Sequence, residues 1–198
     1  MSGIVMGGPE PGPEEAVEEV TAQSLRTGCR VITVTHRGQK TWRHVQNVDD
    51  IVKSLVSAVH PYVIEGKGEI PASVPQHVAT DGSPVYVLRI VDTSNVTQLR
   101  TFEDHVRLCA SSHVIIAEHG AFHSNLIFMR QHALMIDLRG NYNNPATVTF
   151  EQIAEMFGVY YKNVVTKGML QHNQDSFVVA PNEVTEIRDI VLEYFRQG

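Results

Sequence analysis

The sequence predicts an α/β protein: a Rossmann-like, doubly wound and mainly parallel sheet with helices on both faces. Segments rich in β-branched residues alternate along the chain with amphipathic helical patterns, which is typical of βαβ units. The predicted strands are almost continuously apolar, as expected when helices cover both faces of a parallel sheet. With 198 residues, 42% of them hydrophobic, the chain is long enough to bury one substantial core, which we place at residues 29–198.

The first elements follow in order from residue 30. The β-branched run at 30–35 predicts the first strand, and the run at 85–91 predicts another. Between them, apolar residues at helical spacing predict a helix that opens at Asp49 and ends before Pro61. Residues 61–84 are rich in proline and glycine, so we expect an irregular insertion there, with a short hairpin.

The second half of the chain repeats the alternation. Thr101 with Asp104 three residues later forms a variant of the capping box, which predicts a helix running to about Ser111. Further strands are predicted at 113–117, 133–138, 160–165 and, more briefly, 176–180, and further helices at 120–129, from Thr149 to Phe157, and from an Asn182 cap onward.

The N-terminal segment, residues 1–28, differs from the rest. Residues 1–13 contain four glycines and three prolines and predict a flexible stretch. Residues 14–26 predict a short acidic helix, with Gly28 as its stop. The glutamates of this helix are expected to form a solvated face; an acidic binding tail is the alternative.

Composition excludes several classes of protein. A net charge of −6 argues against nonspecific binding to nucleic acid or anionic membranes. Two cysteines, Cys29 and Cys109, are too few for a disulfide framework or a four-cysteine zinc site. No apolar run reaches the roughly 18 residues of a membrane span, and the first residues lack the pattern of a signal peptide. We therefore expect a cytoplasmic location for the chain as given, or the secretory pathway if it is a fragment.

The turn Glu118-His119-Gly120-Ala121 is the first candidate site, because ligands of open α/β sheets bind at the carboxyl ends of strands. A small turn that begins a helix lets an anion such as a pyrophosphate approach the backbone N–H groups. His119 would hydrogen-bond phosphate or ribose. The alternative is that Gly120 and Ala121 only allow the helix and strand to pack closely.

The second candidate region, residues 36–47, follows the first strand and is expected at the same sheet edge. It places Arg37 and Arg43 in an otherwise acidic chain, and arginine suits bidentate recognition of phosphate. Trp42 is either a stacking surface for a base or sugar, or a partly buried loop aromatic. The alternative for the whole region is an ordinary solvated loop.

Other motifs are absent or incomplete. The sequence has no GxGxxG after the first strand, no Walker loop and no Gly-x-Ser-x-Gly elbow, which argues against a dehydrogenase, a P-loop NTPase and a serine hydrolase. His119 and His123 are four residues apart beside Glu118, but the sequence offers no third metal ligand. We predict no metal site, and His123 is expected on a helix surface or in packing.

Several segments in order resemble family 61 glycosyltransferases over about residues 29–198. Glu118-His119-Gly120-Ala121, the later Asn125 and Phe128-Met129, and an apolar strand ending in Asp137 are similar to the hallmark of that family. Arg37-Gly38, Arg43 and Asn47 resemble its arginine-rich loop and its Arg-x-x-x-Asn-Glu motif, with Val48 in place of the glutamate. Phe122-His123 departs from the usual Gly-Leu, and this bulk would narrow or alter the donor site.

The resemblance implies an inverting GT-B enzyme that transfers a hexosyl or pentosyl group from a nucleotide sugar, with a UDP-sugar the expected donor, to a glycan or glycoprotein acceptor. The chain matches the C-terminal, donor-binding half of such enzymes. An N-terminal acceptor domain or a partner subunit would supply the other half. No tightly bound cofactor and no nucleic acid are expected. The alternative is a non-catalytic module that binds nucleotide sugar, or another protein, and has kept the fold.

The resemblance and the positions of residues at the strand ends together give the expected roles. The expected donor-binding set is Arg37, Arg43, Asn47, His119, Gly120, Ala121 and Asn125. The expected catalytic pair is Glu118, as the base that takes the proton of the acceptor hydroxyl, and His119. Glu118 has an alternative role, which is to fix His119.

Overall fold

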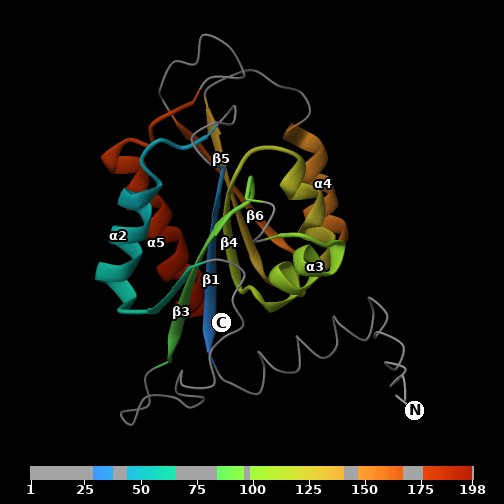
Figure 1. The fold of residues 1–198 in the computed structure, drawn as a ribbon, viewed down its shortest axis with the longest axis horizontal. Coiled ribbons are helices and arrows are strands. Elements are labelled where there is room, and N and C mark those ends of the chain that lie inside the picture. Colours follow the sequence, from blue (N-terminus) through green and yellow to red (C-terminus); the bar gives the residue numbers. More distant parts are fainter. Residues whose placement is uncertain are drawn as a thin grey trace, which may run out of the picture.

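The computed structural model describes residues 29–37, 44–65, 84–95, 99–140, 147–166 and 176–197. They form a six-stranded sheet in the order β2-β3-β1-β4-β5-β6, with every neighbouring pair parallel (Figure 1). The strands are β1 (Arg30–His36), β2 (Tyr62–Glu65), β3 (Tyr86–Asp92), β4 (Val114–Glu118), β5 (Leu134–Gly140) and β6 (Tyr160–Thr166). The predicted Rossmann-like, doubly wound class is confirmed.

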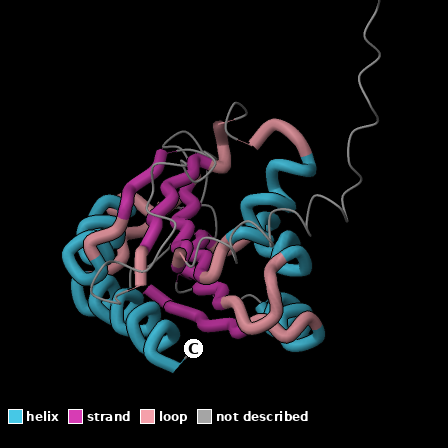
Figure 2. Tube along the Cα trace, turned by 90° about the horizontal axis from the view of Figure 1, so that it is seen from below, coloured by secondary structure: helices cyan, strands magenta, loops and turns pink. Residues whose placement is uncertain are grey.

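Helices cover both faces of the sheet. The first face carries α2 (Val48–Val59) and α5 (Pro181–Gln197), and the second carries α3 (Phe102–Ser111), the 3₁₀ helix η1 (Ala121–Phe128) and α4 (Thr147–Met156). Figure 2 shows the two groups of helices with the strands between them. The chain changes face after β3, because α3 crosses β1 to reach β4.

The core consists of two layers that follow the alternation of the strands. In β4, Val114 and Ile116 pack with α2 and α5, whereas Ile115 and Ala117 pack with the residues of η1 and α4. All five residues of β4 are buried. This two-sided burial explains why the central strands read as continuous apolar runs rather than as alternating ones.

The capping box predicted for α3 is present. The backbone N–H of Asp104 donates to Thr101 Oγ1 at 3.2 Å, and the backbone N–H of Thr101 donates to Asp104 Oδ2 at 3.0 Å. Two N–H groups that have no partner within the helix are thereby satisfied, which fixes where α3 begins.

Two local predictions were wrong. Residues 62–65, expected to be irregular or part of a hairpin, form β2 and pair in parallel with β3, because Tyr62, Val63 and Ile64 favour an extended edge strand. Residues 66–83 lie outside the described part of the chain. Residues 121–128 were expected to form an ordinary helix and are a 3₁₀ helix instead, with His123 N–H donating to Gly120 O at 3.0 Å.

The C-terminal segment also differs from its prediction. Around Phe177, expected in a short strand, the described residues form a single parallel bridge to Val45. The last helix starts at Pro181 rather than after an Asn182 cap, since proline suits the first helical position. Glu183 Oε2 accepts the backbone N–H of Ala180 at 2.8 Å and supplies the cap.

The predicted N-terminal segment, residues 1–28, lies outside the described residues. Within the described ranges, no helix has the length and apolar character that a membrane span requires.

Candidate functional site

The candidate site lies at the carboxyl ends of β1 and β4. β1 is the strand at which the winding of the chain reverses, with β3 on one side and β4 on the other. Such a switch point leaves a crevice at the strand ends where ligands of this fold class bind. Arg37 follows β1 and Gly120 follows β4, so the structure brings together two of the residues predicted to share this edge.

Arg37 lies directly over Gly120. A β-carbon placed on Gly120 would be 2.2 Å from Arg37 Nη2, and that same nitrogen donates to His119 O at 3.5 Å. Gly120 has φ +153°, a conformation that residues with a side chain rarely adopt. The backbone conformation therefore favours glycine here, and a β-carbon would also displace the end of the Arg37 side chain. Arg37 is 21% exposed and Ala121 is exposed, so solvent reaches this position.

Glu118 connects the two candidate regions through its carboxylate. Oε2 accepts the backbone N–H of Arg37 at 3.0 Å, and Oε1 accepts that of Val45 at 2.5 Å. The guanidinium of Arg37 is near as well, with Nε 3.8 Å from Oε2. Burial raises the pKa of Glu118 to about 7, although the hydrogen bonds from Val45 and Arg37 and the charge of Arg37 oppose the rise; the charge of Asp92 adds to it.

His119 points to the other side of β4, where it meets Asp137. His119 Nδ1 is 2.8 Å from Asp137 Oδ2, and that oxygen also accepts Arg139 Nε at 2.6 Å and Tyr161 Oη at 2.7 Å. His123 Nε2 is 3.1 Å from the second oxygen, Oδ1. We call these five residues the Asp137 cluster.

Asp137 is a fixed negative charge. Its side chain is fully buried, and burial alone would raise its pKa; the hydrogen bonds and charges of His119 and His123 outweigh this and hold the pKa well below the ordinary value. His119 Nδ1–H donates to the Asp137 carboxylate, which fixes the orientation of the imidazole ring at the end of β4.

Two other predicted residues, Asn47 and Asn125, have different surroundings. Asn47 exchanges hydrogen bonds with the backbone of Val179, with Oδ1 accepting at 2.9 Å and Nδ2 donating at 2.9 Å, so its role here is structural. Asn125 Nδ2 is 3.3 Å from His105 Nδ1, so this η1 residue contacts α3. Arg43, like Trp42, lies outside the described residues.

The supporting residues of the site were missed by sequence reasoning. His123 is fully buried, which excludes a helix surface and leaves packing, and its Nδ1 has no hydrogen-bond partner among the described residues. Arg139 and Asp137 are two positions apart in β5 and therefore share a face. Two charged residues at alternate positions of an otherwise apolar strand are the signal from which this buried cluster could have been predicted. Among the described residues, no three ligating side chains are arranged to hold a metal ion.

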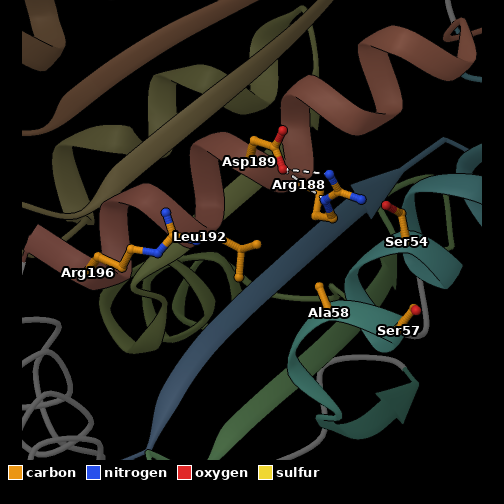
Figure 3. Close-up of a pocket in the computed structure, with 7 residues that line it drawn as sticks. All are labelled: Ser54, Ser57, Ala58, Arg188, Asp189, Leu192 and Arg196. Carbon is orange, nitrogen blue, oxygen red and sulfur yellow. Dashed lines mark hydrogen bonds and ion pairs between the residues drawn. The ribbon is translucent and has the colours of Figure 1, made fainter.

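A hollow on the surface lies elsewhere. A groove of about 500 Å³ runs between α2 and α5 (Figure 3). Its lining residues are Ser54, Ser57, Ala58, Arg188, Asp189, Leu192 and Arg196. None of them was predicted for the site, and α2 and α5 lie on one face rather than at the strand ends. We place the site by its chemistry, at the switch point.

Comparison with protein-family models gives no match to the chain. Comparison with curated proteins gives no significant match either.

Proposed function

We propose that this domain binds the diphosphate of a nucleotide sugar at the switch point, and that it is the donor half of an inverting glycosyltransferase. A UDP-sugar is the expected donor and a glycan or glycoprotein the expected acceptor, as the resemblance to family 61 implies. The observation that supports the proposal best is the position of Arg37, whose guanidinium lies over Gly120 at the start of η1.

Electrostatics explains why this arrangement suits an anion. A helix start carries partial positive charge on its N–H groups, and a guanidinium beside it adds a full positive charge. A diphosphate placed between them would satisfy both, with the planar guanidinium matching two phosphate oxygens. His119, oriented by Asp137 on the adjacent strand, would bind a phosphate or ribose oxygen.

A non-catalytic binding module is the second candidate, and one observation favours it. Both carboxylate oxygens of Glu118, the expected base, accept backbone N–H groups, and the residue is 4% exposed. A general base must reach the hydroxyl whose proton it takes. His119 is as deeply buried, at 5% exposed, so in a transferase the base would come from an N-terminal acceptor domain or partner subunit.

Calorimetric titration tests the proposal. UDP, GDP and the matching diphosphate sugars would be titrated into the protein with and without Mg²⁺ or Mn²⁺. We expect one nucleotide to bind, and Arg37→Ala to weaken it by about tenfold or more, the usual effect of losing a hydrogen bond to a charged group. Arg188→Ala, an arginine on α5, is the matched control.

Two outcomes would contradict the proposal: no binding of any nucleotide to the folded protein, or equal losses in Arg37→Ala and Arg188→Ala. A second assay distinguishes the two candidate functions. Release or transfer of the sugar in the presence of glycan acceptors supports the transferase, whereas binding without turnover supports the module.

A further inference from the structure

Glu118 has an unusual set of partners for a buried acid. Its two oxygens accept N–H groups from residues on either side of positions 38–44, one at the end of β1 and one just before α2. Its only cationic partner among the described residues, Arg37, is 3.8 Å away. A buried carboxylate usually has a closer charged partner, so this one serves mainly to position backbone.

We infer that Glu118 is a positioning residue, whose charged carboxylate links the end of β1 to the segment entering α2 and so holds Arg37 over Gly120 for diphosphate binding. The inference rests on the proposed function and assigns that site a dependence on pH. It also replaces the expected role of Glu118 as the catalytic base.

The far end of this link is itself immobilised. Gln46 N–H donates to Phe177 O at 2.9 Å and Phe177 N–H donates to His44 O at 3.1 Å, which fastens the residues around Val45 to the segment before α5. Asn47 adds two hydrogen bonds to Val179. Because Val45 is fixed, a carboxylate bound to it can act as an anchor for Arg37.

Protonation would weaken the link, because a carboxylic acid loses its charge and has one good acceptor oxygen in place of two. The pKa of about 7 places this change within the range of ordinary buffers. The other charged groups around Glu118 are Arg37, which favours the charged form, and Asp92 at the end of β3, which opposes it. Three histidines adjoin these groups in sequence: His119 follows Glu118, His36 precedes Arg37 and His44 precedes Val45.

The first test measures affinity against pH. UDP-glucose and GDP-mannose are suitable probes, because their diphosphate diesters exchange no proton between pH 6 and 8. If binding requires charged Glu118, the Kd of the wild type rises about tenfold from pH 8 to pH 6. In Glu118→Gln the Kd is weaker at pH 8 and this tenfold rise is lost. His36→Gln and His44→Gln should keep the rise, and Glu103→Gln, an exposed glutamate on α3, is the matched control.

The second test needs no ligand. Amide hydrogen exchange reports the protection of the Arg37 and Val45 N–H groups directly. Glutamine keeps one acceptor oxygen but presents an N–H₂ group to the other amide, so one of the two protection factors should fall by about tenfold or more. Glu118→Ala should lower both. Exchange in β5 should stay unchanged, which excludes general unfolding.

The outcomes separate the two claims. If nucleotide binds with the same pH dependence in wild type and Glu118→Gln, the positioning role of Glu118 is wrong and the proposed function stands. The same conclusion follows if nucleotide binds and both amides keep their protection in Glu118→Gln. If neither probe binds, and no other nucleotide binds, the proposed function is wrong. The positioning role is then wrong as well, even where the amides lose protection as expected.

Discussion

Two buried carboxylates lie on neighbouring strands at the same edge of the sheet, and their surroundings have opposite effects. Glu118 of β4 and Asp137 of β5 are both almost completely shielded from solvent. Yet the pKa of Glu118 is raised to about 7, whereas the pKa of Asp137 is held well below its ordinary value. Burial is therefore not what decides the charge of an acid in this domain.

The difference lies in the donors. Glu118 faces the α2 side, where it meets two backbone N–H groups and a guanidinium 3.8 Å away. Asp137 faces the η1 and α4 side, where histidine, arginine and tyrosine side chains surround it within about 3 Å. The comparison teaches that the Asp137 cluster is a permanent support, while the Glu118 side is able to respond to pH.

The largest expected effect comes from removing the permanent charge. Asp137→Asn keeps the shape but leaves Arg139 buried without its counter-charge and turns an N–H₂ group toward other donors. We expect a loss of about 3–5 kcal/mol in the free energy of unfolding, measured with urea. Asp189→Asn, at an exposed ion pair on α5, should change it by less than about 1 kcal/mol. Equal effects of the two substitutions would mean that the buried charge of Asp137 stabilises the fold no more than the exposed charge of Asp189.

The pH dependence of stability should have opposite signs for the two acids. For Glu118 the folded pKa is raised, so its contribution to stability is complete below about 4.5 and is lost as the pH rises through about 7. For Asp137 the folded pKa is lowered, so its contribution is complete above about 4 and is lost as the pH falls through the folded value.

Glu118→Gln should therefore flatten the curve of unfolding free energy between pH 4.5 and 7, a change on the order of 3 kcal/mol. Urea unfolding at a series of pH values measures it. A Glu118→Gln curve that still falls across this window would place the titrating group elsewhere.

A smaller effect is expected at the contact between Arg37, which follows β1, and Gly120, which follows β4. Gly120→Ala puts a methyl group where Arg37 Nη2 now lies and forces a backbone conformation that alanine rarely adopts. We expect a loss of about 1–3 kcal/mol in unfolding free energy, together with weaker nucleotide binding. In the Arg37→Ala background the backbone strain should remain while the collision disappears, so a double-mutant cycle separates them. A cycle with no coupling would mean that the end of the Arg37 side chain moves away from the added methyl group at no cost.

The sequence predicted the strands and the sheet edge at which the candidate site lies better than it predicted which side chains contact one another. Alternating β-branched and amphipathic runs predicted the parallel sheet, and strand ends predicted that Arg37 and Gly120 meet. The sequence did not distinguish the 3₁₀ helix that carries Asn125 from an α-helix; a 3₁₀ helix advances about 2 Å per residue, so different side chains share a face. The hydrogen bonds of Glu118 to Val45 and of Asp137 to Tyr161 join distant segments, and no local pattern specifies such pairs.

The link between Asn47 and Val179 has a consequence for how the domain is made. These two residues are 132 positions apart, so their hydrogen bonds cannot form until the ribosome has released the chain beyond Val179. Until then the nascent polypeptide can pair β1, β3 and β4, but the approach to α2 has no support from the C-terminal side. The sheet edge that carries the candidate site is thus expected to be completed late during synthesis.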